Sequence, residues 1–163
     1  MVKRNLRLFS LIIILVIILD QFTKILVLSK IDLHGSVPLI SGFFSIVHTR
    51  NRGMAFGFLN NPAPGPAFYF LTGASILAVL LITYWFSRIK EYEKALIPGL
   101  ALILGGALGN LIDRLRIGEV IDFLDVQIGS YQWPAFNIAD SCISVGTIWV
   151  VVCLLFIINP DQQ

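Results

Sequence analysis

Histidine and cysteine, the side chains that most often bind transition metals or form disulfides, each occur only twice in this chain. Cys142 and Cys153 are eleven positions apart in one apolar stretch, so on a helix they would lie about 16 Å apart, too far for a disulfide. His34 and His48 form no paired-histidine spacing, and no CxxC or HExxH motif is present. The sequence therefore predicts no protein-built metal site and no cofactor.

Charge is also scarce. Charged residues make up 13% of the 163 residues and hydrophobic residues 56%, and the mean hydropathy is +0.83. These proportions are typical of polytopic membrane proteins, and the length predicts a single membrane-embedded domain over 1–163. The net charge of +2 and the scattered basic residues exclude a nucleic-acid partner. No soluble domain is visible, so no obligate protein partner is indicated.

Four apolar stretches are each long enough to cross a bilayer, which requires about 20 residues. They cover about 8–28, 67–86, 95–113 and 138–158. Lys3, Arg4 and Arg7 precede the first stretch, as in a secretory signal peptide. No small-residue cleavage site follows, however, and apolar residues resume at Ile25, which predicts an uncleaved helix with its basic end in the cytoplasm. Four spans then place both termini in the cytoplasm.

The two loops on the other side of the membrane contain strand-like segments. FFSIVHT, at 43–49, is rich in β-branched and aromatic residues, and a second segment at 120–128 is followed by a Gly129-Ser130 turn and a short strand. Between them, the apolar residues around Met54 and Phe56 favour a loop or short helix in the headgroup layer. The predicted fold class is an all-α polytopic membrane protein with these small additions.

Gly105 and Gly109 have the small-xxx-small spacing that allows close helix contact in membranes. The spacing favours a packing role. It leaves open whether the contact is within one chain or between two chains.

The polar residues of the chain gather at one boundary of the membrane. Given the predicted topology, the extracytoplasmic boundary holds Asp20, Lys24, Asn51, Asn110, Asp113, Arg114, Asp122, Asn137 and Asp140. Ionised groups beside hydrocarbon are costly, and polar residues placed for solubility would occur at both boundaries. A shared functional site explains this one-sided distribution best.

Each of these residues also has a structural interpretation. Asp20 and Lys24, four apart, could form an interfacial ion pair that reaches water. Asn137 could cap the fourth helix, with Asp140 at its third position, and Asp122 could be solvated on an exposed strand. Asn51 could be a turn residue beside a glycine. Taken singly these interpretations are favoured, except for the Asp20–Lys24 pair, for which a structural and a functional role are equally supported. Together they do not explain the clustering.

Asp122 and Asp140 are the candidates for acid–base chemistry. They are eighteen residues apart, and the predicted hairpin between them can bring the fourth helix beside the third. Two neighbouring carboxyl groups tend to share one proton, so that one can activate water while the other protonates a carbonyl oxygen. This is the chemistry of aspartic proteases. The start of a helix favours the ionised form of Asp140, which indicates that Asp140 is the base.

The chain resembles the lipoprotein signal peptidase family, also called signal peptidase II, which are membrane aspartic proteases of bacteria. Four motifs carry the resemblance, in order: DQFTK, NRGMAFG, GGALGNLIDRLRIGEVIDF and FNIADS. The resemblance implies a catalytic dyad of Asp122 and Asp140, with the other seven polar residues lining the site. It implies four transmembrane helices, an extracytoplasmic β-cradle and a short periplasmic helix in the cytoplasmic (inner) membrane of a bacterium. The implied partners are membrane lipids and a diacylglyceryl-modified prolipoprotein, cut before its lipid-modified cysteine.

Three alternatives remain open. A proton-coupled transporter also uses membrane carboxylates, although usually near the bilayer midplane between repeats. A serine–lysine protease could use Ser141 and Lys24. A non-enzymatic scaffold could be held together by the glycine-spaced helix.

Overall fold

The computed structural model describes residues 2–51 and 65–158, with side chains from Asn5 onward. Its four main helices are α1 (Val2–Lys30), α2 (Pro66–Arg88), α3 (Ile97–Ile117) and α4 (Ile138–Val152). A 3-10 helix, η1 (Glu91–Leu96), precedes α3, and a π-helical turn, η2 (Cys153–Ile157), extends α4. All four main helices belong to segments long and apolar enough to cross a membrane, which confirms the prediction of four long apolar helices.

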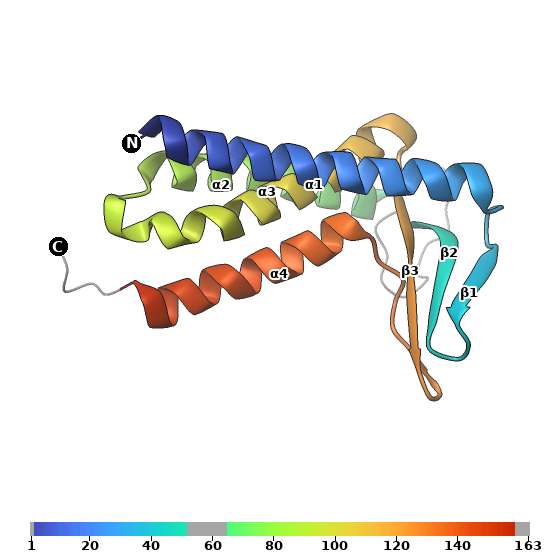
Figure 1. The fold of residues 1–163 in the computed structure, drawn as a ribbon. Coiled ribbons are helices and arrows are strands. Elements are labelled where there is room, and N and C mark those ends of the chain that lie inside the picture. The colour runs from blue at the N-terminus through green and yellow to red at the C-terminus, as the bar shows by residue number, and fades with distance from the viewer. Residues whose placement is uncertain (1, 52–64, 159–163) are drawn as a thin grey trace.

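Helix α3 is the centre of the bundle and lies between α1 and α4 (Figure 1). In the most apolar 18-residue stretch of the span that contains α3, 61% of the residues are buried, whereas the corresponding stretches of the other three spans are 22% buried or less. Only α3 is therefore largely shielded from the surroundings. Gly105 and Gly109 allow α1 to approach, because an added Cβ would lie 2.8 Å from Val16 or 2.6 Å from the Asp20 carboxylate. Both glycines therefore pack within the chain.

The extramembrane segments form one four-stranded antiparallel sheet in the order β1-β2-β3-β4. Its strands are β1 (Ser36–Ile40), β2 (Phe44–Asn51), β3 (Val120–Ile128) and β4 (Tyr131–Gln132). The sheet corrects the all-α fold class, because the protein combines helices with a real sheet. Strands β2, β3 and β4 follow the prediction. Strand β1 was not expected because Pro38 lies inside it, and proline is tolerated here because β1 is an edge strand.

The sheet lies across the end of the bundle that is opposite the start of α1 and the end of α4 (Figure 1). Val27 of α1 packs against Ile121 and Phe123 of β3 and joins the two parts. Gly118, with a φ of 75°, ends α3 in the left-handed conformation and lets the chain turn directly into β3. The last residues of α3 and the first of β3 are thus fixed beside each other.

The register of β2 against β3 contains a bulge next to Asp122. Ile46 faces Leu124 and Thr49 faces Asp122, so β2 carries one extra residue over this interval. Bulges of this kind redirect side chains near functional sites. The predicted interfacial segment around Met54 and Phe56 lies outside the described residues.

Candidate active site

Asp122 is a buried carboxyl group held by two asparagine side chains. Asn137 Nδ2 donates to its Oδ1 at 2.8 Å, and Asn51 Nδ2 donates to its Oδ2 at 3.0 Å. Thr49 Oγ1 donates to its backbone carbonyl at 3.0 Å and fixes this part of the strand. Because Asp122 is only 3% exposed, the alternative of a solvated surface aspartate is wrong.

Asp140 lies in the first turn of α4 and is half-buried. Its Oδ1 accepts a hydrogen bond from Asn110 Nδ2 at 2.8 Å, and its Oδ2 accepts one from the Asn137 backbone N–H at 3.2 Å. In return the Asp140 N–H donates to Asn137 Oδ1 at 2.9 Å, which completes the capping box expected from the sequence. The cap does not compete with a site role, because it positions the carboxyl group.

Asn137 connects the two carboxyl groups and is completely buried. Its side-chain amide contacts Asp122, while its backbone N–H contacts Asp140. The same amide group also donates to Asn110 Oδ1 at 3.2 Å. One residue therefore ties together the end of α3, strand β3 and the start of α4.

The electrostatics of the pair favour a proton on Asp122. Burial, and then the negative charge of nearby Asp140, raise the pKa of Asp122 from 3.8 to about 7, although the hydrogen bonds from Asn51 and Asn137 act in the opposite direction. Removal of a carboxylate from water disfavours its charged form, and a neighbouring carboxylate adds to this effect. Near neutral pH the pair can thus hold one proton between its two members.

A buried ionic cluster supports this pair from the side of α1. Lys24 Nζ lies 2.8 Å from Asp20 Oδ2 and 2.7 Å from Asp113 Oδ2, and it donates to Asn110 Oδ1 at 3.0 Å. Lys24 is 1% exposed, so the predicted ion pair forms but does not reach water. Asp20 Oδ1 also accepts from the Ala139 N–H at 3.0 Å, which links α1 to the start of α4.

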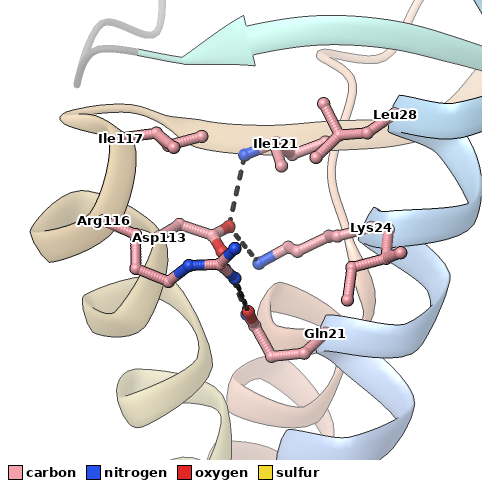
Figure 2. A pocket seen from close by; sticks show the side chains of 8 residues that line it. Gln21, Lys24, Leu28, Asp113, Arg116, Ile117 and Ile121 are labelled. Atoms are coloured by element: carbon pink, nitrogen blue, oxygen red, sulfur yellow. Dashed lines mark hydrogen bonds and ion pairs between the residues drawn. The ribbon is translucent and has the colours of Figure 1, made fainter.

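Gln21 is a member of this cluster that the sequence prediction missed. Its Nε2 donates to Asp113 Oδ1 at 2.9 Å and to the Gly109 carbonyl at 3.2 Å, and its Oε1 accepts from Arg116 Nη1 at 3.3 Å. In Figure 2, Lys24 and the Ile121 N–H both reach the Asp113 carboxylate, and the Arg116 guanidinium meets the Gln21 side chain. The available signal was the position of Gln21 beside Asp20 in the DQFTK motif.

Eight of the nine predicted site residues form one network of hydrogen bonds and ion pairs: Asp20, Lys24, Asn51, Asn110, Asp113, Asp122, Asn137 and Asp140. Arg114 lies apart from these contacts. It is half-buried on α3, and its Nη1 donates to Ser75 Oγ of α2 at 3.2 Å. This contact places the guanidinium between α2 and the carboxyl-rich end of α3.

A cleft of about 550 Å³ opens beside Asp122 on the sheet. Thr49 and Asn51 of β2 line it on one side, and Trp133 and Pro134 line it on another. Within residues 2–51 and 65–158, no group of three or more His, Cys, Asp or Glu side chains is arranged to hold a metal ion. The arrangement suits a reaction that needs paired carboxyl groups and room for a chain-like substrate.

A family model described as signal peptidase (SPase) II matches residues 12–156. The chain belongs to the signal peptidase II family. It is 48% identical over 156 residues to the lipoprotein signal peptidase of Syntrophus aciditrophicus, covering 94% of this chain and 95% of the relative. The lipoprotein signal peptidase of Geobacter sulfurreducens is 44% identical over 153 residues, with 94% of each chain covered.

Solved structures agree with this signal peptidase II assignment. Two structures described as bacterial membrane enzymes superpose with TM-scores of 0.80 and 0.79, at 33% and 34% sequence identity. The superposition on the first structure covers 95% of this chain and 91% of the solved chain. The superposition on the second covers 91% of this chain and 92% of the solved chain. Family membership makes the protein a protease that removes signal peptides from prolipoproteins. Its four apolar helices make it a multi-pass bacterial membrane protein.

Proposed function

We propose that this protein is an aspartic endopeptidase that removes the signal peptide from diacylglyceryl-modified prolipoproteins, with Asp122 and Asp140 as the catalytic pair. The observation that supports this most directly is the position of Asn137, which hydrogen-bonds both carboxyl groups at once. The cleft beside Asp122 offers room for an extended peptide to reach this member of the pair. The other seven polar residues bind or support the reacting groups.

In this mechanism Asp122 is the protonated member and Asp140 the ionised one. Asp140 accepts two hydrogen bonds in the first turn of α4, where the helix dipole favours negative charge. Asp140 takes a proton from water, whose oxygen attacks the scissile carbonyl carbon, while Asp122 donates its proton to the carbonyl oxygen. As the intermediate collapses, the C–N bond breaks, Asp140 protonates the leaving nitrogen and Asp122 regains a proton from the hydroxyl group.

The position of the site in the bundle fits a substrate anchored in lipid. The pair lies at the sheet end of the helices, whereas the start of α1 and the end of α4 lie at the other end (Figure 1). With the basic start of α1 in the cytoplasm, the site faces the extracytoplasmic boundary of the cytoplasmic membrane. A signal helix in the bilayer then ends at the pair, and cleavage occurs before the lipid-modified cysteine.

The contacts oppose two of the rival mechanisms. Lys24 is engaged by two carboxylates and an amide, so it is not available as a base for serine, and Ser141 Oγ instead donates to the Asn137 carbonyl at 2.9 Å. The carboxyl groups gather at one end of the helices rather than at the middle, where transporter sites usually lie.

The test is cleavage of a lipidated precursor by purified protein in detergent. Wild type is compared with Asp122→Asn, Asp140→Asn and Ser141→Ala, and one arm contains a chelator. We expect both asparagine variants to lose cleavage and the alanine variant and the chelator arm to retain it. Near-normal turnover in either asparagine variant would refute the dyad, and loss with chelator would indicate a metal instead.

A further inference from the structure

The cleft on the sheet continues well past the catalytic pair. It begins at Asp122 and extends to Asp125, Gln132 and Trp133, which lie further along β3 and after its turn. Its volume of about 550 Å³ exceeds what the cleaved bond alone requires. The part of the cleft around Asp125, Gln132 and Trp133 is called the distal cleft below.

The direction of the substrate decides what fills the distal cleft, and this step rests on the proposed function. The signal segment lies in the bilayer alongside the helices and reaches the catalytic pair at its extracytoplasmic end. The chain after the cleaved bond must then leave the helices. The strands run across the helix ends, away from the bundle (Figure 1). The substrate residues that follow the modified cysteine are therefore the ones that reach the distal cleft.

The distal cleft has a definite charge. Asp125 is half-buried, and its Oδ1 accepts a hydrogen bond from Gln132 Nε2 at 2.8 Å, which fixes the carboxylate at the wall. Arg50 also lines the cleft, but its Nη1 lies 3.6 Å from Glu119 Oε2, so its charge is partly balanced by that carboxylate. Among the described residues that line the cleft, Asp125 is thus the carboxylate that is neither protonated nor part of an ion pair.

We propose that the distal cleft binds the residues that follow the lipid-modified cysteine, and that Asp125 makes it select against acidic side chains there. A side-chain carboxylate at the second to fourth residue would face Asp125, whereas a lysine or arginine would be attracted to it. Two unit charges about 4 Å apart in a water-like environment change an equilibrium by about fivefold. The protease therefore discriminates among precursors by the sequence after the cut as well as before it.

The test uses three diacylglyceryl-modified precursors that differ only at the second and third residues after the cysteine, which are lysine, glutamine or glutamate. We expect wild type to cleave the lysine form at least about fivefold more efficiently than the glutamate form, as kcat/KM, with most of the difference in KM. The ratio should shrink at high ionic strength, because the groups are near solvent. Equal cleavage of all three forms would overturn the proposal.

Variants assign the selection to Asp125. Asp125→Asn should bring the lysine-to-glutamate ratio close to one. Gln132→Lys places a cation beside Asp125, neutralises its charge and should also bring the ratio close to one, even if Asp125→Asn fails to fold. Asp32→Asn removes a carboxylate from an exposed residue in the loop between α1 and β1 and should leave both the activity and the ratio unchanged. An unchanged ratio in both cleft variants would refute the role of Asp125.

Failure of this proposal is distinguishable from failure of the proposed function. If Asp122→Asn abolishes cleavage of every precursor but all three are cleaved equally by wild type, only the distal cleft assignment is wrong. If no lipidated precursor is cleaved, the proposed function itself fails.

Discussion

Replacing Asp122 by asparagine should make the stability of the folded protein less sensitive to rising pH. The pKa of this carboxyl is raised from 3.8 to about 7 by burial and by Asp140. Between these two pH values the unfolded chain has released the proton that the folded protein still holds, so stability falls as pH rises and levels off above pH 7. At about 1.36 kcal/mol per pKa unit, the loss between pH 5 and pH 8 amounts to about 3 kcal/mol. The asparagine amide does not ionise, so the variant lacks this loss.

The measurement is the free energy of unfolding of both proteins in one detergent at several values between pH 5 and pH 8. An amide offers one acceptor oxygen where the carboxyl group has two, so one hydrogen bond from Asn51 or Asn137 is lost at a cost of about 1–3 kcal/mol at every pH. At pH 5 the variant should therefore have a lower free energy of unfolding than wild type. By pH 8 the difference between the two proteins should have shifted by about 3 kcal/mol in favour of the variant. Asp32→Asn is the matched control and should keep the wild-type slope. Parallel pH profiles for wild type and Asp122→Asn would refute the reasoning.

Three further substitutions test the support of the site. Lys24→Met leaves two buried carboxylates without their cation and should destabilise the protein by about 3–5 kcal/mol, whereas Lys30→Met, at the exposed end of α1, should change unfolding little. Gly106→Ala should lower the thermal midpoint because its Cβ would clash with a backbone carbonyl of α4, whereas Gly73→Ala meets open space and should be neutral or stabilising. Asn137→Ala removes the side-chain hydrogen bond to the Asp122 carboxyl group and the cap on the Asp140 N–H, and should lower kcat about tenfold to a hundredfold in the precursor cleavage assay. Near-normal kcat would contradict the role of the Asn137 side chain in positioning the two acids.

The one-sided gathering of polar residues could be predicted because it depends only on the number and direction of the spans. The four apolar stretches set the topology, and the topology sends Asp20, Asn110 and Asp140 to one end whatever their contacts. The individual pairings could not be predicted in this way. Lys24 contacts Asp113 on another helix, and that choice depends on how far α1 is rotated about its axis, which the close packing at Gly105 and Gly109 determines.

Predictions made from neighbouring residues alone were wrong where the position of a residue in the tertiary structure decided its conformation or its burial. Pro38 suggested a break, yet β1 accommodates it because the strand has a partner on one side only. Asp122 looked like an exposed strand residue, yet the packing of β3 against the bundle buries it. Conversely, the cap at Asn137 was predicted correctly because it involves only neighbours in sequence. Whether Asp122 and Asp140 are catalytic stays a prediction until the variants are assayed.

The order of the elements along the chain has a consequence for biosynthesis. Asn137 and Asp140 lie at the start of α4, the last of the four helices to leave the ribosome, whereas every other member of the network precedes them. On the proposed assignment, a nascent or truncated chain that lacks α4 has neither the second acid nor the residue that orients the first. Proteolytic competence therefore arises only once the final helix has been inserted, so incomplete translation products cannot cut other membrane proteins.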